Sequence, residues 1–244
     1  MQSRRVASCD RVRPLVSNER APLVLPSSVP LTTPDGFGAR LEAVGASVSP
    51  SMLAQLGDYL ARLLAMNEQM NLTAIKGAES AWERHVRDAL TLLPLIADQP
   101  AGSLLVDIGS GGGIPGIPLA IARPDLRVSL VEATQKKCAF LVAVSAAIGL
   151  TNVTVHAERA EDLGKSKLRG AFDVVTARAV ARLAALAPLV LPFARPGGLV
   201  LLIKGQRADE ELAEATSVIE KQHATHEGTL ATPTGRIVKL RRNA

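Results

Sequence analysis

The segment of residues 104–116, LLVDIGSGGGIPG, constrains the fold of this chain more than any other. Its apolar first half ends around Asp107, and four glycines follow between residues 109 and 113. Glycine is needed where a backbone turns sharply, adopts a positive φ or lets a ligand lie against the main chain. The segment therefore predicts a buried strand that leads into a loop shaped to hold a nucleotide.

Strand-like and helix-like patterns alternate after this loop. The 244 residues, 47% of them hydrophobic, are enough for one main α/β domain with a sizeable core. The alternation favours a mostly parallel sheet with a ligand at the carboxyl ends of the strands. The expected strands are residues 104–108, 126–132, 153–156, 173–177, 198–204 and 236–240. The expected helices are a segment that ends near residue 122 and residues 135–148, 183–191 and 209–222, with Thr134 as the N-cap of the second.

Composition limits the class of protein. The two cysteines, Cys9 and Cys138, have no partners at a metal-like spacing, so we expect neither a disulfide framework nor a metal site. No apolar run reaches the roughly 18 to 20 residues of a membrane span, and the first residues lack the apolar core of a secretory signal. We therefore expect a cytoplasmic protein without a membrane partner. The net charge of +5 suits a polyanionic partner, but the six aromatic residues are scattered, so arginine and lysine would hold a nucleic acid.

The chain divides into three expected segments. Residues 1–46 carry arginines among Ser, Pro and Gly without periodicity, which predicts a disordered basic leader or simply a solvated tail. Residues 47–100 show leucines at helical spacing from Ser51 onward and a second helical pattern around Trp82, which predicts a small helical cap. Residues 101–244 form the ligand-binding domain.

The glycine loop fits two kinds of nucleotide. The spacing G-x-G-x-x-G at Gly111, Gly113 and Gly116 suits a dinucleotide and also S-adenosylmethionine. Asp107 lies just before the loop, where a carboxylate can face a cationic amino-acid group and would repel a pyrophosphate; alternatively, it only orders the loop. The one tyrosine, Tyr59, has no lysine four residues later, so the proton-donating pair of many dehydrogenases is missing. These features favour S-adenosylmethionine and hence methyl transfer.

The ends of the second and third strands carry further candidates for cofactor binding. Glu132 closes the second strand, where an acid accepts hydrogen bonds from ribose hydroxyls in both nucleotide classes. The third strand leads into residues 157–162, where Glu161 or Asp162 and a main-chain N–H can reach an adenine edge. The alternative for these acids is an ordinary solvated turn.

The residues after the fourth strand bear on the methyl acceptor. Cys138 lies within a helix and is not placed as the nucleophile that pyrimidine C5 methylation requires. The loop at residues 176–179, TARA, has neither the acceptor nor the ring used for exocyclic amines. Arg178 there suits guanine N7, whose neighbouring O6 accepts a hydrogen bond; alternatively, Arg178 forms a salt bridge to Glu161 or Asp107. Alkylation of N7 releases no proton from the base, so no general base is assigned.

Taken together, these motifs resemble a known family. Over roughly residues 50–242 the chain is similar to the bacterial small-subunit ribosomal RNA guanine-N7 methyltransferases, the RsmG family, formerly glucose-inhibited division protein B. The residues that carry the resemblance are Asp107 to Leu119, Glu132, Lys136-Lys137, Phe140-Leu141, Arg159-Ala160-Glu161, Val174 to Val180, Lys204-Gly205, Asn67, Asn71-Leu72-Thr73, Trp82 to His85 and Asp88-Ala89-Leu90. Two motifs depart from the family pattern: Glu132-Ala133 stands where Asp-Ser is common, and Ala89 stands where the family has a serine.

The resemblance implies a fold, a reaction and a set of residues. The implied fold is a Rossmann-like class I methyltransferase with a seven-stranded, mostly parallel sheet, helices on both faces and a small N-terminal helical cap. The implied reaction is S-adenosylmethionine-dependent methylation of N7 of guanine 527 of 16S rRNA in the small (30S) ribosomal subunit, by a monomer. Motif matching puts family cofactor contacts on Gly109, Ile114, Ala160, Glu161 and Arg178. With the loop and strand-end residues, the cofactor-binding candidates are Asp107, Gly109, Gly111, Gly113, Ile114, Glu132, Ala160, Glu161 and Arg178.

Four basic residues are candidate RNA contacts. They are Arg84, His85, Lys136 and Lys204. The alternatives are that His85 packs between cap and sheet, that Arg84 pairs with Asp88 one helical turn on, and that Lys204 is a surface lysine. The competing functions are an S-adenosylmethionine-dependent methyltransferase of another RNA or of a small molecule, and a silent adenosine-binding module. Salt-sensitive binding would distinguish an rRNA enzyme from a small-molecule methyltransferase.

Overall fold

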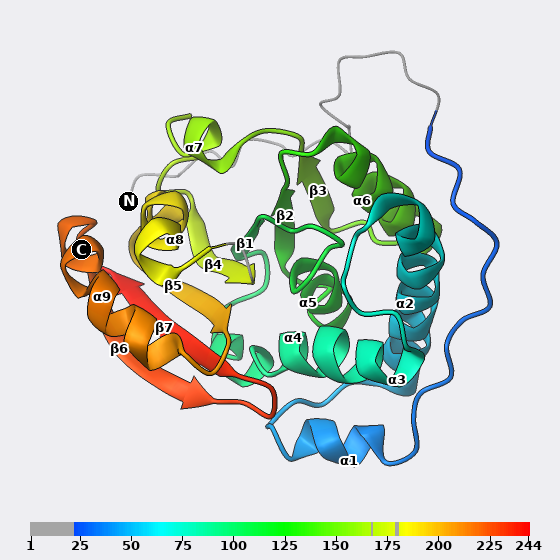
Figure 1. The fold of residues 1–244 in the computed structure, drawn as a ribbon. Coiled ribbons are helices and arrows are strands. Elements are labelled where there is room, and N and C mark those ends of the chain that lie inside the picture. The colour runs from blue at the N-terminus through cyan, green and yellow to red at the C-terminus, as the bar shows by residue number, and fades with distance from the viewer. Residues whose placement is uncertain (1–21, 167, 179–180) are drawn as a thin grey trace, which may run out of the picture.

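A seven-stranded sheet runs through the middle of the molecule (Figure 1). The computed structural model describes residues 22–166, 168–178 and 181–244. The strand order is β3-β2-β1-β4-β5-β7-β6, with β1 to β5 parallel and β7 antiparallel to both of its neighbours. The strands are β1 (Leu104–Ile108), β2 (Arg127–Val131), β3 (Val153–His156), β4 (Phe172–Arg178), β5 (Ala194–Lys204), β6 (Ala224–Ala231) and β7 (Arg236–Arg242). The expected α/β class with a seven-stranded, mostly parallel sheet is confirmed.

Helices cover both faces of this sheet. Those of the domain are α5 (Gly116–Ala122), α6 (Gln135–Ala147), α7 (Ala160–Leu163), α8 (Leu183–Val190), the 3-10 turn η3 (Leu191–Phe193) and α9 (Ala208–Lys221). Those before the sheet are α1 (Phe37–Glu42), α2 (Pro50–Met70), α3 (Ala78–Ala81), the π-helical turn η1 (Trp82–Arg87), α4 (Asp88–Leu90) and the 3-10 turn η2 (Leu93–Ile96). Helices α2, α5 and α6 lie on one side of the sheet, and α8 and α9 lie on the other (Figure 1). Among the helices in the described part of the chain, none is both long enough and apolar enough to cross a membrane.

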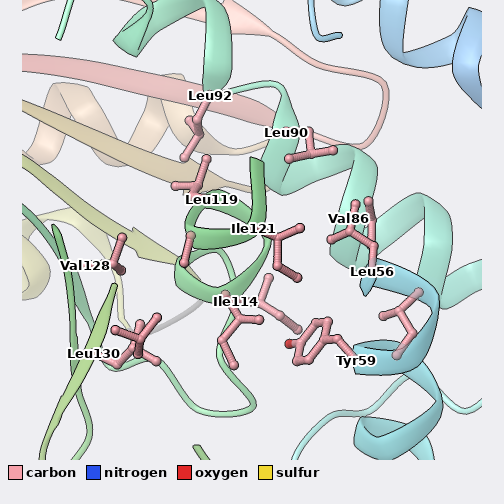
Figure 2. Close-up of a cluster of buried hydrophobic side chains, with 14 of the residues drawn as sticks. Leu56, Tyr59, Val86, Leu90, Leu92, Ile114, Leu119, Ile121, Val128 and Leu130 are labelled. Carbon is pink, nitrogen blue, oxygen red and sulfur yellow. The ribbon is translucent and has the colours of Figure 1, made fainter. Parts of the chain in front are cut away.

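Alternate residues of the central strands supply two separate cores. Leu105 of β1 and Val174 of β4 face the core beneath α2, α5 and α6. Val106 and Val175, the next residues along each strand, face the core beneath α8 and α9. A strand buried on both faces needs an unbroken apolar run, which is why the run before the glycine loop is recognisable in the sequence. Figure 2 shows part of the first core, where side chains from α2, η1 and α4 meet α5.

The predicted elements are found with small changes at their ends. All six expected strands are present, and residues 104–108 and 153–156 match without change. The cap helix around Trp82 is broken into α3, η1 and α4. Strand β6 is not among the expected strands, because it is an edge strand whose residues are mostly exposed and carry no apolar signal.

The prediction of a disordered leader over residues 1–46 is wrong for residues 22–46; residues 1–21 lie outside the described part. Residues 22–34 run in extended form along the outer side of the cap to α1 (Figure 1). The main-chain N–H of Leu31 donates to the Gly57 carbonyl of α2 at 3.1 Å. A side chain at Gly57 would collide with the Leu31 carbonyl oxygen, 2.3 Å from an added Cβ, so this glycine lets the segment pass over α2.

Helix α1 docks through an aromatic contact and an ion pair. The rings of Phe37 and Trp82 meet edge to face with centroids 5.0 Å apart, and Phe37 is 1% exposed. Arg40 pairs with Glu83 at 2.9 Å. The anchoring residues are spaced too widely among polar ones and prolines to show a long apolar period, which is why the sequence pattern does not reveal this docking.

Substitution of Phe37 tests whether α1 belongs to the folded unit. We expect Phe37→Ala to lower the free energy of unfolding by about 3 to 5 kcal/mol, because a buried aromatic ring is lost and a cavity remains. Urea unfolding of the full chain measures this. The control is Val24→Ala, since Val24 is 86% exposed and its loss should cost less than about 0.5 kcal/mol. Equal stability of the two variants would contradict the docking of α1.

Candidate active site

The glycine loop between β1 and α5 lies at the carboxyl ends of the parallel strands. Gly109, Gly111 and Gly113 adopt φ values of 71°, 56° and 100°, which favour glycine strongly over other residues. The N–H groups of Gly109 and Ser110 both donate to the carbonyl of Val131, at 2.9 and 3.0 Å, so the loop is tied to the end of β2. The predicted loop is therefore present, and its backbone follows from the glycines.

The carboxylate of Asp107 holds the end of this loop through hydrogen bonds. Its Oδ2 accepts from the N–H of Gly116 at 3.2 Å and its Oδ1 from the hydroxyl of Thr176 at 3.0 Å. The side chain is 0% exposed, and burial raises the pKa of its carboxyl to about 6. These contacts support the alternative that Asp107 orders the loop, because both oxygens are bonded within the protein and closed off from a ligand. A side chain at Gly116 would come within 2.3 Å of Leu130, so this helix start needs a glycine.

Glu132 holds the loop from the end of β2. Its Oε2 accepts from the N–H of Gly111 at 3.0 Å and its Oε1 from the N–H of Thr134 at 2.8 Å. Thr134 is the N-cap of α6, as predicted, but its side chain makes no capping bond, and Glu132 bonds the backbone there instead. Glu132 is thus shared between the glycine loop and the start of α6.

One face of the glycine loop is open. A Cβ added to Gly111 would meet only the carbonyl oxygen of Gly109, at 3.9 Å. A Cβ on Gly112 or Gly113 would instead come within 2.8 Å of Leu63 or within 2.5 Å of Ile117. The loop therefore packs against the protein through Gly112 and Gly113 and presents open backbone at Gly111. Open backbone beside a strand-end carboxylate fits the adenosine and amino-acid parts of S-adenosylmethionine.

The remaining cofactor candidates lie around this open face or inside the core. Ile114 follows the loop and is 8% exposed, packed near Tyr59 of α2 (Figure 2). Ala160 and Glu161 begin α7, which follows the carboxyl end of β3, and the Glu161 side chain is exposed. The sheet order brings the ends of β1, β2 and β3 side by side, so these candidates share one edge of the sheet. Lys136 lies in the first turn of α6, four residues after Glu132, and is exposed.

Arg178, the last residue of β4, is held by the cap. Its Nη2 lies 3.0 Å from Nδ1 of His85, its Nη1 donates to the carbonyl of Arg84, and Nη1 lies 3.9 Å from the Asp88 carboxylate. The alternative predicted for it, a salt bridge to Glu161 or Asp107, is not what the structure contains. The side chain is 19% exposed, so the guanidinium is fixed on one side and partly open on the other.

His85 is buried and not open to RNA. It is 1% exposed, and its Nε2 lies 2.9 Å from the Thr73 hydroxyl. Because Nδ1 faces an arginine donor, Nδ1 is the acceptor and Nε2 carries the proton. Burial and the charge of Arg178 lower the pKa of His85 to about 4, so it is neutral at pH 7. The predicted RNA contact by His85 is therefore wrong, and its packing alternative is correct.

The other RNA candidates divide into exposed and buried side chains. Arg84 is exposed; Asp88, its predicted partner, accepts a hydrogen bond from Thr234 and lies near Arg178. Lys204 is wrong as an RNA contact, because its side chain is only 7% exposed. Its ammonium lies 2.8 Å from Glu211 and 2.5 Å from the carbonyl of Ala181, so it joins β5 to α9 and to the start of α8.

Several site residues were not predicted. Tyr59 bonds to the loop, and Thr176 bonds to Asp107, which holds the end of the loop. The cluster around Arg178 contains three more such residues, Thr73, Asp88 and Thr234. Tyr59 carried one signal, a lone phenol on the apolar face of a helix, where a buried hydroxyl needs a partner. In the described part of the chain, no group of three or more His, Cys, Asp or Glu side chains is arranged to hold a metal ion.

Comparisons with known proteins identify the family of this chain. The GidB family model, described as rRNA small subunit methyltransferase G, matches residues 52–236. The ribosomal RNA small subunit methyltransferase G of Sorangium cellulosum (strain So ce56) is 65% identical over 226 residues, which cover 93% of this chain and 95% of that protein. The protein of the same name from Streptococcus pyogenes serotype M1 is 39% identical over 190 residues, covering 77% of this chain and 79% of that protein.

A solved structure shows the likeness in fold alone. The ribosomal protein L11 methylase of Lactobacillus delbrueckii subsp. bulgaricus matches with a TM-score of 0.51 and 14% identity, over 66% of this chain and 79% of that one. This agrees with the expected Rossmann-like methyltransferase fold. The family match covers well over half of the chain, and the relatives match over most of their own length. This chain belongs to the GidB family, the rRNA small subunit methyltransferase G proteins.

Proposed function

We propose that the protein transfers a methyl group from S-adenosylmethionine to N7 of guanine 527 of 16S rRNA in the small ribosomal subunit. The observation that carries the proposal is the position of Arg178. It ends β4, the strand beside β1, and the cap fixes its guanidinium with one side partly open. A fixed arginine donor next to a nucleotide-binding loop suits an acceptor with an exposed lone pair and a neighbouring oxygen, as guanine has at N7 and O6.

The loop residues would bind and orient the cofactor. S-adenosylmethionine, when bound, would supply a methyl group on a sulfonium sulfur; an in-line displacement would transfer that methyl group to the acceptor, with the neutral thioether as the leaving group. The open backbone at Gly111 would let the ligand lie against the main chain, and Glu132 would accept hydrogen bonds from ribose hydroxyls. Ile114 would contribute an apolar wall, and Ala160 and Glu161 would contact the adenine edge. Asp107 would act indirectly, by holding Gly116 at the start of α5.

Arg178 would position the acceptor base. Alignment of a lone pair with the methyl carbon provides most of the acceleration in such a displacement, so the residue needs a fixed side chain more than an unusual pKa. His85 and the Arg84 carbonyl supply that fixation. Because N7 carries no proton, no general base is required.

Exposed cations would contact the rRNA backbone. Arg84 lies beside the Arg178 cluster, and Lys136 lies at the start of α6. We propose that both bind phosphates. We also propose that the protein acts as a monomer and works in the cytoplasm, where ribosomal subunits are assembled. Binding through phosphates weakens steeply as salt rises, which a small-molecule acceptor would not show.

Methyl transfer to ribosomal subunits tests the proposal. Small subunits from a strain that lacks this protein would be incubated with labelled S-adenosylmethionine, and N7-specific chain cleavage would locate the label. One cleavage at guanine 527 is the expected result. Label at another nucleotide would contradict the position, and cofactor binding without label in rRNA would contradict the reaction.

Gly111→Val should abolish cofactor binding while the domain stays folded. A valine side chain would occupy the open face of the loop where the ligand is expected, and calorimetry should show affinity for S-adenosylmethionine lowered more than about 100-fold. Gly102→Val is the matched control, because Gly102 also has a positive φ, 84°, but faces open space away from the site. Both variants carry backbone strain of about 1 to 2 kcal/mol. Equal affinity in the two variants would contradict the assigned loop face.

Arg178→Ala should reduce kcat for methyl transfer about 100-fold to 1000-fold, the usual cost of removing a fixed donor. The control is Arg195→Ala, since Arg195 pairs with Asp173 at 2.6 Å near the opposite ends of the strands. Its activity should match that of the unaltered protein. Full activity of Arg178→Ala would reduce this residue to a structural part of the pocket.

The pH dependence of the free energy of unfolding should reveal that the carboxyl of Asp107 is buried. Its pKa is about 6 in the folded protein against 3.8 ordinarily, so the folded state binds more protons between these values and the free energy of unfolding falls as pH rises. We compare the protein with Asp107→Asn by urea unfolding, so that contributions from other groups cancel. Relative to that of Asp107→Asn, the free energy of unfolding of the unaltered protein should fall by about 2 to 3 kcal/mol between about pH 4 and about pH 6.5. A difference that stays constant with pH would contradict the buried carboxyl.

A further inference from the structure

We propose that Tyr59 is a positioning residue for the cofactor, which it serves by fixing the glycine loop from the helical cap. The inference rests on the proposed function, because it assigns a role in S-adenosylmethionine binding. Tyr59 lies on α2, about fifty residues before the loop, and no motif of the loop includes it. It makes the cap a part of the cofactor site as well as of the fold.

A single hydrogen bond carries the contact. The hydroxyl of Tyr59 donates to the main-chain carbonyl of Gly112 at 2.8 Å, and the side chain is 0% exposed. Burial raises the pKa of this phenol far above its ordinary value, so the hydroxyl keeps its proton and remains a donor. Figure 2 shows the ring projecting from α2 toward Ile114. A buried carbonyl that loses its donor is costly, which gives this bond control over the shape of the loop.

Close packing around Gly112 supports the same role. A Cβ on Gly112 would lie 2.8 Å from Leu63 of α2 and 3.6 Å from the Leu72 carbonyl oxygen. The main chain at Gly112 is therefore pressed between the cap and the domain. The neighbouring Gly111 faces open space on the ligand side. The hydrogen bond from Tyr59 thus acts on the residue directly next to the one expected to touch the ligand.

Tyr59 completes a set of three side-chain anchors on the loop. Asp107 accepts from Gly116 and Glu132 accepts from Gly111, so both act on N–H groups from within the sheet. Tyr59 acts on a carbonyl and comes from the cap. The peptide that joins Gly112 to Gly113 is also held at its N–H, which donates to the carbonyl of Ser110 at 2.7 Å. Tyr59 supplies the side-chain donor for the carbonyl of the same peptide.

The test compares two hydrogen bonds on the same helix. Tyr59→Phe removes only the hydroxyl, and Gln55→Leu removes a bond from Gln55 to the carbonyl of Ile148 at 2.7 Å, which also joins α2 to the domain but away from the loop. Calorimetry and steady-state kinetics on the full chain use S-adenosylmethionine and small ribosomal subunits. We expect Tyr59→Phe to raise Kd and KM for S-adenosylmethionine about tenfold, with kcat and KM for subunits changed less than about twofold. Gln55→Leu should leave all four values unchanged.

Each alternative result has a definite meaning. Unchanged Kd in Tyr59→Phe overturns the inference and leaves the proposed function intact. Equal losses in both variants also overturn it, because Tyr59 would then only help to dock the cap. If the unaltered protein does not bind S-adenosylmethionine, the proposed function itself fails and this inference falls with it.

A second measurement uses the chain without a substitution, so it does not depend on whether Tyr59→Phe folds. Tyr59 is the only tyrosine in the chain, so fluorotyrosine labelling places a single fluorine reporter at this ring. Titration with S-adenosylmethionine should shift the one fluorine resonance with the same Kd that calorimetry gives. A resonance that stays unchanged while the ligand binds would overturn the role of Tyr59.

Discussion

The hydrogen bonds between side chains and the glycine-loop backbone are the constraint on which the site depends. Glycines allow the loop its positive φ values but cannot select one loop shape, because they are equally free to adopt others. Asp107, Glu132 and Tyr59 make that selection by bonding to Gly116, Gly111 and Gly112. Each anchor comes from a different element, namely β1, the end of β2 and the cap helix α2. The shape of the glycine loop, the proposed cofactor site, thus follows from how the sheet and the cap are assembled.

The cap also fixes Arg178, the residue proposed to position the methyl acceptor. Arg178 ends β4 but takes its bonds from residues of η1 and α4, and Asp88 of α4 in turn bonds Thr234 before β7. One polar cluster therefore links the cap, the centre of the sheet and its antiparallel edge. Docking of α1 and of residues 22–34 against α2 and η1 extends this support to the N-terminal side. This linkage joins the cluster around Arg178 and the glycine loop through the same cap and sheet.

Local patterns predicted much of the fold, and tertiary contacts decided what they missed. The strand at residues 104–108 and the glycine loop were predictable because an apolar run and glycines have strong local preferences. Strand β6 was missed because an exposed edge strand carries no apolar period. The roles of His85 and Lys204 were misjudged because residue type does not reveal burial. Both side chains are almost fully buried and bond to neighbouring residues. The sequence shows that Asp107 lies just before the glycine loop. Only its bonds to Gly116 and Thr176 show that the carboxylate faces inward.

A loop held by three anchors should be formed before any ligand binds. Preorganisation of this kind means that binding need not supply the free energy to order the loop. Amide hydrogen exchange of the ligand-free protein, read at the N–H groups of Gly111, Gly113 and Gly116, tests this most directly, since all three are hydrogen-bonded within the loop or to its anchors. The account predicts slow exchange at these amides without S-adenosylmethionine and little further slowing when it is added. Exchange as fast as in an unfolded chain, with protection only after the ligand is added, would contradict it.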